Sequence, residues 1–458
     1  MKKMIIAAAV CAALCIVPVQ AKKKPEPEPK KPAPFASTYQ AISSAPVLIQ
    51  HATLLTGTGE RLDDADILLQ DGKIQALGKN LSPPSNAVVI DATGKWVTPG
   101  IIDVHSHLGV YASPGIDAIS DGNEATSPVT AHVWAEHSLW PQDAGFAKAL
   151  AGGVTSMQIL PGSANLVGGR SVIIKNVAAT TYQAMKFPGA PQGIKMACGE
   201  NPKRVYGEKG GPSTRMGNMA GYRAAFIGAE AYRKKWDAYE KDGRKGDAPD
   251  VDLANETLAG VLRGDIFVNI HCYRSDEMAA MIDLSKEFGF QISSFHHGVE
   301  AYKIADVLAH ENICGALWAD WWGFKLEAFD AIEENIALVD KPEGGCAIVH
   351  SDSAEGIQRL NQEAAKVIAT SARVNINITP EHAIKWLTSN AAKALHIDKQ
   401  TGSLEAGKMA DVVIWNGTPF SSYAKAEQVF IDGALLYDRN NKALQPKVDF
   451  LIGQEAQP

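Results

Sequence analysis

The stretch from Thr98 to Val110, TPGIIDVHSHLGV, carries an apolar run directly into two histidines. Its Ile- and Val-rich part is typical of a short, buried parallel strand. Residues i and i+2 of a strand point to the same side, so His105 and His107 should point together where the strand ends. Two neutral imidazoles that converge on one point can bind a metal ion. Two ordinary hydrogen-bonded histidines are the alternative, and the rest of the chain must decide between them.

Polar residues of the same kind end four further apolar runs. These residues are Glu200, His271, the pair His296 and His297, and Asp352. In a parallel barrel the carboxyl ends of the strands meet on one face, where active sites form. A single buried histidine at a strand end is more often structural than a metal ligand. Such residues at five strand ends of one barrel are unlikely to arise by chance, which favours a metal site.

The central part of the chain contains eight apolar, strand-like runs that alternate with amphipathic helices. The runs begin at Gly100, Gly153, Arg170, Gly193, Asp265, Gln291, Ile313 and Cys346. Helical patterns are clearest after the fifth, sixth and seventh runs. Eight strands with helical crossovers predict a parallel sheet closed into a (β/α)₈ TIM barrel, which we place at residues 99–400.

Short alternating strands separated by Gly and Asp turns fill residues 45–98, and the same pattern returns at residues 401–446. Neither piece has enough strands to form a stable sheet alone. We expect them to combine into one small domain. The predicted fold class is therefore α/β: a TIM barrel with a small β-sandwich domain built from both chain ends.

Residues 1–21 have a basic start, a short apolar middle and small residues near Ala21, which is the layout of a secretory signal peptide. The apolar part is shorter than the roughly 20 residues of a membrane span, so we expect no stable span. A lipoprotein anchor at Cys11 or Cys15 is the alternative, although the residues before each cysteine fit that signal poorly. Residues 22–44 alternate Pro with charge and read as a solvated linker. The expected location is periplasmic or secreted.

Four cysteines follow the signal peptide, and none of them shows a CxxC spacing. They are Cys198, Cys272, Cys314 and Cys346. Three lie in or beside apolar runs, so we expect buried thiols and see no reason for a disulfide.

The composition describes an ordinary globular protein, with 46% hydrophobic and 21% charged residues. Its formal net charge of −7 argues against nucleic acid as a partner, because phosphate binding needs clustered Lys and Arg. We expect a small-molecule substrate. A homo-oligomer is allowed but not indicated.

Several motifs together resemble the amidohydrolase superfamily, in its imidazolonepropionase-related branch. They are PGIIDVHSH, NIHCYR, FHHGVEAYKIADVLA, VHSDS and LTSNAAKALHIDKQTGSLEAGKMADVVIW. The resemblance covers nearly all of the chain after the signal peptide. It implies one or two divalent metal ions, usually zinc, with His105 and His107 binding the first ion together with Asp352.

The same resemblance implies that His271 and His297 are the ligands of the fifth and sixth strands. His297 is preferred over His296 because the family motif places its histidine immediately before Gly-x-Glu. On the fourth strand, some relatives carry a carbamylated lysine and others a glutamate. We favour Glu200, which ends the run, over Lys195, which lies well inside it, and the choice stays open.

This ligand set predicts a metal-dependent hydrolase of carbon–nitrogen bonds. A divalent metal lowers the pKa of water and polarises a carbonyl, and Asp352 can move the proton from water to the leaving nitrogen. Candidate substrates are a dipeptide, an N-acyl amino acid or a cyclic amide. The alternatives are a deaminase or an ester or lactone hydrolase on the same site, and, in another class, a non-catalytic periplasmic metal- or solute-binding protein.

Polar residues close to these strand ends should bind the substrate. The candidates are Tyr273, Arg274, Arg204 and Arg215. An arginine can clamp a carboxylate with two parallel hydrogen bonds, which predicts a substrate that carries one. The competing interpretation is that the arginines pair with nearby acidic residues, such as Glu208 or Asp276, and only hold their loops.

Overall fold

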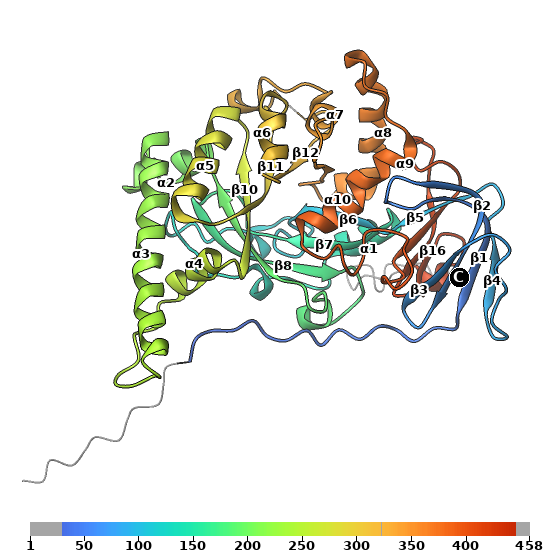
Figure 1. Cartoon of the computed structure of the whole chain (residues 1–458), viewed down its shortest axis with the longest axis horizontal. Helices are drawn as coiled ribbons and strands as arrows, with labels where there is room; N and C mark the ends of the chain where they lie inside the picture. The colour runs from blue at the N-terminus through green and yellow to red at the C-terminus, as the bar shows by residue number, and fades with distance from the viewer. Residues whose placement is uncertain (1–29, 322, 446–458) are drawn as a thin grey trace, which may run out of the picture.

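The computed structural model describes residues 30–321 and 323–445, in which a barrel and a β domain lie side by side (Figure 1). The predicted signal peptide and the first residues of the predicted linker lie outside the described residues. Within the described ranges, no helix combines the length and the apolar character needed to cross a membrane.

The β domain is built from both ends of the chain, as predicted. Its strands are β1 (Val47–Leu55), β2 (Arg61–Gln70), β3 (Lys73–Gly78), β4 (Val88–Asp91), β5 (Trp96–Pro99), β14 (Val412–Trp415), β15 (Ala426–Ile431) and β16 (Ala434–Asp438). They form one sheet in the order β16-β15-β14-β5-β1-β2-β3, with β4 also paired to β1. The two chain ends meet where β5 and β14 pair antiparallel, with Val97 opposite Ile414.

The barrel sheet uses all eight predicted runs. Its strands are β6 (Ile101–Ser106), β7 (Val154–Ile159), β8 (Val167–Lys175), β9 (Gln192–Ala197), β10 (Ile266–Cys272), β11 (Ile292–His297), β12 (Cys314–Leu317) and β13 (Ala347–Val349). They follow one another around the sheet in chain order. Nearly every residue of these strands is buried, which explains why they read as continuous apolar runs.

One strand departs from the predicted parallel arrangement. Strand β8 runs antiparallel to both β7 and β9. Only residues 160–166 connect β7 to β8, and the 176–191 connection to β9 contains no α-helix. A parallel crossover needs a dozen or more residues, usually with a helix, whereas antiparallel neighbours need only a short link. As a result the end of β8, Lys175, points toward the β domain rather than toward the predicted active-site face.

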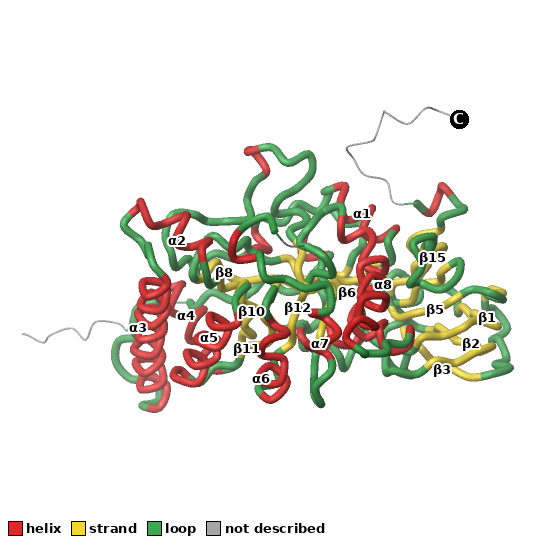
Figure 2. Tube along the Cα trace, turned by 90° about the horizontal axis from the view of Figure 1, so that it is seen from above, coloured by secondary structure: helices red, strands yellow, loops and turns green. Residues whose placement is uncertain are grey.

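Helices cover the outside of the barrel. They are α1 (Ala144–Ala151), α2 (Glu200–Tyr206), α3 (Arg215–Lys241), α4 (Leu253–Arg263), α5 (Ser275–Phe288), α6 (Ala305–His310), α7 (Asn335–Asp340), α8 (Leu360–Ser371), α9 (Pro380–Ala383) and α10 (Ser389–Ala394). Figure 2 shows α5, α6 and α7 in a row beside β10, β11 and β12. Helix α5 buries Met278, Met281 and Ile282, the spacing of one helix face. The long α3 lies at the end of the molecule opposite the β domain (Figure 1).

Two disulfides join neighbouring strands, so the expectation of four free thiols is wrong. Cys198 follows β9 and bonds Cys272 at the end of β10, while Cys314 begins β12 and bonds Cys346 just before β13. The Cα atoms are 5.2 and 4.6 Å apart, the usual range for a disulfide. The partners are 74 and 32 positions apart along the chain, and such distances carry no spacing signature.

Residues 30–46, which we call the N-terminal strap, have no helix or strand but are not a free linker. The strap runs along the barrel from α4 to the β domain (Figure 1). At its start Lys31 Nζ lies 3.9 Å from the ring centre of Trp236 on α3. Further along the strap, the Tyr39 hydroxyl donates to Asp432 Oδ2 at 2.5 Å, and near its end Ser44 Oγ donates to the Gly433 carbonyl at 3.2 Å. Most residues of the strap are exposed, as expected of a solvated linker, but a few of its side chains contact both domains.

The contact of the strap with Asp432 belongs to a buried charged network between the two domains. Lys175 is fully buried, and its Nζ donates to Asp432 Oδ1 at 2.7 Å and to Asp411 Oδ1 at 3.0 Å. Thr401 Oγ1 also donates to Asp411, at 2.8 Å. Because β8 is antiparallel, it delivers this lysine to the β domain.

Candidate metal centre

His105 and His107 meet Asp352 at the carboxyl end of β6. The Nε2 atoms of the two histidines are 3.2 Å apart, and Asp352 Oδ1 lies 3.3 Å from the first and 3.2 Å from the second. Ligands bound at about 2.0–2.2 Å to one zinc ion have similar separations. His107 Nδ1 donates to the Leu160 carbonyl at 2.9 Å, which leaves the lone pair on Nε2, toward Asp352. The three side chains can therefore hold one metal ion.

His271 and His297 complete the cluster from β10 and β11. Their ring centres are 4.6 Å apart, and His297 Nδ1 lies 3.9 Å from Asp352 Oδ2. The Nδ1 atom of each ring is buried and has no hydrogen-bond partner among the described residues. Burial lowers the pKa of both imidazoles well below the usual value, so both are neutral near pH 7. Buried, neutral and unpaired nitrogens are what a metal ion requires.

The two adjacent histidines of β11 have different surroundings. His297 lies beside Asp352, whereas His296 Nδ1 lies 2.6 Å from Nδ1 of His105, the nitrogen of that ring that does not contact Asp352. His296 is completely buried. The structure therefore brings the expected histidine, His297, to the cluster and places its neighbour behind the first ligand.

On the fourth strand, the structure brings Lys195 to the histidines and does not bring Glu200. Lys195 Nζ lies 3.5 Å from His105 Nε2, and burial lowers the pKa of this lysine to about 7. Strand β9 ends at Ala197, and Gly199, with φ of 81°, turns the chain so that Glu200 begins α2. The Glu200 carboxylate lies 3.4 Å from Lys325 Nζ instead.

His350 also belongs to the cluster and was not predicted. Its ring stacks on His105 with 5.1 Å between centres and meets His297 at 5.0 Å. Both of its nitrogens are buried without a partner among the described residues. It precedes Asp352 by two positions, the same i, i+2 relation that drew attention to His105 and His107, so the sequence did carry a signal.

Comparisons with known proteins show which family this chain belongs to. The model of the Amidohydrolase family matches residues 342–438. An amidohydrolase of known structure from Thermotoga maritima MSB8 is 38% identical with a TM-score of 0.79, and the match covers 86% of this chain and 100% of that one. The chain belongs to the amidohydrolase family.

Two curated members of the amidohydrolase group are also similar over most of this chain. Amidohydrolase tasK of Hapsidospora irregularis is 32% identical over 431 residues, which are 86% of this chain but 43% of tasK. The chain thus spans less than half the length of that relative. The imidazolonepropionase of Shewanella pealeana is 24% identical over 409 residues, covering 78% of this chain and 87% of the enzyme.

In this amidohydrolase the histidine cluster is accessible to solvent beside Asp352 and His107, whose side chains are 25% and 18% exposed. Tyr273 is buried beside the cluster, with its ring centre 4.6 Å from that of His271. Lys325 Nζ lies 4.3 Å from the centre of the same tyrosine ring and donates to Asn201 Oδ1 at 2.9 Å. Lys325 was not predicted, because it comes from a loop with no strand-end signature.

The three predicted arginines of this amidohydrolase differ in what they can bind. Arg274 is held by Asp276 through hydrogen bonds of 2.9 and 2.8 Å. Arg215 Nε lies 3.0 Å from Glu277 Oε2, and the same guanidinium also forms an ion pair with Glu327. The interpretation that the arginines pair with acidic residues and only hold their loops therefore fits Arg274 and Arg215, since their charges are already neutralised. Arg204 is exposed and forms no ion pair with any described residue.

Arg204 also influences two partly or fully buried side chains through its charge. Burial raises the pKa of Tyr273, and the positive charge of Arg204 opposes that shift. Burial lowers the pKa of Lys325, and Arg204 lowers it further. Arg204 is thus the predicted arginine whose charge is not neutralised by an acidic partner among the described residues.

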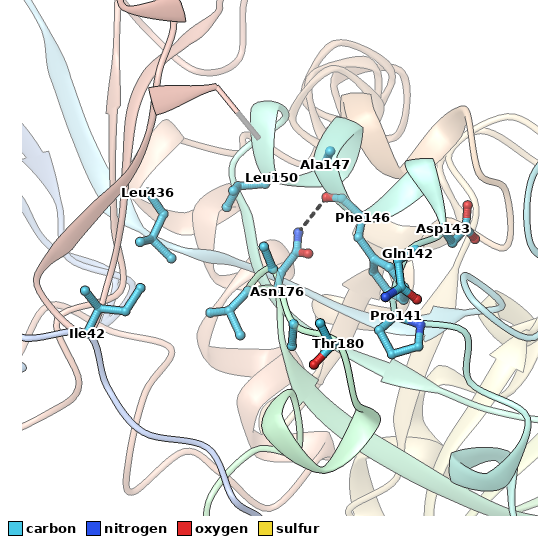
Figure 3. A pocket seen from close by; sticks show the side chains of 13 residues that line it. Ile42, Pro141, Gln142, Asp143, Phe146, Ala147, Leu150, Asn176, Thr180 and Leu436 are labelled. Carbon is cyan, nitrogen blue, oxygen red and sulfur yellow. Dashed lines mark hydrogen bonds between the residues drawn. The ribbon is translucent and has the colours of Figure 1, made fainter. Parts of the chain in front are cut away.

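Figure 3 shows a separate cavity of about 400 Å³ between the strap, α1 and β16. Ile42, Phe146, Leu150 and Leu436 give it a mainly apolar lining. Its acidic residue, Asp143, already accepts hydrogen bonds from the backbone N–H groups of Gly109, Ser113 and Gly145. With no free catalytic group among its described residues, this cavity is not the reaction site.

Proposed function

We propose that this chain is an exported, metal-dependent hydrolase that cleaves a carbon–nitrogen bond in a small amide bearing a carboxylate. The observation that carries the proposal is the convergence of His105, His107 and Asp352, whose ligand atoms all lie within 4.8 Å of one another. His271 and His297 supply two further neutral nitrogens beside them. A bound divalent metal, zinc in the first instance, would lower the pKa of water and polarise the carbonyl under attack.

Asp352 is the residue for the proton transfers. Burial by itself would raise the pKa of its carboxyl group, but His297 and His107 lower that pKa well below the ordinary value, so the group is ionised at neutral pH. It can accept a proton from the attacking water and deliver it to the nitrogen that leaves as the C–N bond breaks. A protein that only captured a metal or solute would have no need of such a group at the open side of the site.

We propose Lys195 as the fourth-strand group, in place of Glu200. Its amine is buried beside His105, and a pKa of about 7 leaves much of it neutral and nucleophilic near pH 7. A neutral amine can add carbon dioxide, losing one proton, and so become a carbamate with two oxygen ligands. Glu200 has the required oxygens but is engaged by Lys325.

A substrate carboxylate is supported by one cationic side chain that is not already paired. Arg204 has no acidic partner among the described residues, whereas Lys325 Nζ lies 3.4 Å from the carboxylate of Glu200. Dipeptides, N-acyl amino acids and carboxylated cyclic amides all fit this pattern.

Export is supported by the two disulfides, since such bonds persist in oxidising compartments.

The proposal is tested on protein purified with zinc and never exposed to chelator. We expect at least one metal ion per chain and hydrolysis of members of an amide panel that includes dipeptides, N-acyl amino acids and lactams. Esters, lactones and aminopurines in the same panel test the other reaction classes. Metal content well below one ion per chain, or metal-loaded protein that turns over no amide, would refute the proposal.

A further inference from the structure

The first metal ligand of the cluster, His105, is held from behind by another histidine rather than by a carboxylate or a backbone carbonyl. His105 Nδ1 and His296 Nδ1 are 2.6 Å apart, and both residues are at most 1% exposed. At this distance one of the two nitrogens carries a proton and the other accepts it in a hydrogen bond. Which nitrogen holds the proton decides whether His105 can bind a metal.

The contacts of the two rings settle the direction of this hydrogen bond. His105 Nε2 faces Asp352 Oδ1 at 3.3 Å and His107 Nε2 at 3.2 Å, so this nitrogen must keep its lone pair free for a metal. A neutral imidazole has one N–H group, which for His105 is then on Nδ1. His105 Nδ1–H therefore donates to Nδ1 of His296.

His296 must in turn carry its proton on Nε2, and that nitrogen has acceptors. Ser294 Oγ lies 2.7 Å from His296 Nε2, and Asn269 Oδ1 lies 3.3 Å away. The Ser294 hydroxyl donates onward to Asn269 Oδ1 at 2.8 Å. All three residues are buried. The chain from His105 through His296 and Ser294 to Asn269 is thus satisfied when His105 Nδ1 is the first donor.

We propose that His296 is a positioning residue that fixes the metal-binding tautomer and the ring orientation of His105. This inference rests on the proposed metal-dependent function. Partners of metal-bound histidines are usually carboxylates, carbonyls or water. Here the partner is a neutral side chain, and the buried chain behind it ends on the amide of Asn269, so it holds the ring without adding negative charge.

Two substitutions of His296 separate this role from simple packing. His296→Phe keeps a ring of similar shape but removes the acceptor. His296→Asn loses the ring but places Oδ1 three bonds from Cα, where Nδ1 was, and so keeps the acceptor. Packing alone predicts that Phe is tolerated better than Asn. Positioning of His105 predicts the reverse order.

The measurement is zinc affinity by competition with a chromophoric chelator, with thermal unfolding of the metal-free protein recorded alongside. We expect His296→Phe to weaken zinc binding by about 10- to 100-fold, and His296→Asn to stay closer to wild type despite a lower melting temperature. Phe295→Leu, a buried change on the same strand, is the control and should lower stability without altering affinity.

Equal zinc affinity of His296→Phe and wild type would overturn the inference, as would a greater loss in the Asn variant than in the Phe variant. Wild-type protein that binds no zinc would instead refute the proposed function, and the inference with it. The two failures are therefore distinguishable in one titration series.

Discussion

Asp352 and His105 are joined twice: the backbone N–H of Asp352 donates to the carbonyl oxygen of His105 at 3.1 Å, and Asp352 Oδ1 lies 3.3 Å from His105 Nε2. The two residues belong to the two ends of the barrel sheet, after β13 and within β6. Asp103 reinforces the junction by accepting from the backbone N–H of His105 at 3.1 Å and of Ser351 at 3.2 Å. The same contacts thus join the two ends of the barrel sheet and bring His105 and Asp352 together.

Replacing Asp352 by Asn should abolish most activity while leaving the fold intact. The amide has the size of the carboxylate but cannot accept the proton, and general-base catalysis contributes about 10²–10⁴-fold. Steady-state kinetics on the best amide substrate measure the loss, and circular dichroism checks the fold. Near-normal turnover would show that Asp352 does not transfer the proton.

Lys195→Ala should empty the metal site, whereas Glu200→Ala should leave it filled. Lys195 Nζ lies beside His105, and the Glu200 carboxylate lies beside Lys325. Elemental analysis of the two variants, prepared side by side with wild type, decides between them. The opposite pattern, with metal lost only from the glutamate variant, would restore Glu200 as the ligand.

Arg204→Ala should reduce kcat/KM for carboxylate-bearing amides by roughly tenfold or more, because a charged hydrogen bond contributes about 1.5–3 kcal/mol and 1.4 kcal/mol is one decade. Arg274→Ala is the matched control, since Asp276 already holds that guanidinium. Substrates whose carboxylate is replaced by an amide should not distinguish Arg204→Ala from wild type. Equal losses in both variants, or on both substrate forms, would contradict the assignment.

Lys175→Met should destabilise the protein by roughly 3–5 kcal/mol, because it leaves the buried carboxylates of Asp411 and Asp432 without their cation. Adding Asp432→Asn to that variant should recover part of the loss. Lys303→Met, which removes an exposed ion pair with Asp330, should change stability by less than about 1 kcal/mol. Denaturant unfolding of the four proteins tests this, and a Lys175 variant as stable as wild type would refute it.

The strands and the histidine cluster were predictable from the sequence. Buried strands appear as apolar runs, and residues at the strand ends appear as polar residues directly after these runs. Each of the eight apolar runs forms a barrel strand, and His105, His107, His271, His297 and Asp352 converge. Strand direction leaves no such mark, since a run buried on both faces looks the same in either orientation. The short 160–166 connection was the available sign that β8 is antiparallel.

Two features could not be predicted from the position of a residue along the chain: how far its side chain extends, and which distant residue it pairs with. Glu200 seemed nearer to the metal because it follows the strand, yet the long side chain of Lys195 reaches the histidines from within it. The cysteine pairs depend on which strands are neighbours in space. Arg274 was different: its acidic partner, Asp276, is only two positions away and was visible in the sequence.

The Cys198–Cys272 bond turns the segment between β9 and β10 into a covalent ring. The ring contains α2, α3 and α4 and carries Asn201, Arg204 and Arg215, while Cys272 directly follows His271. Both ends of the segment are thereby fixed next to the candidate metal centre, and lengthening such a loop adds little closure entropy. A change of sequence or length inside the ring therefore leaves His271 anchored by the adjacent disulfide, so this segment of the chain can vary beside the site at little cost to the position of that histidine.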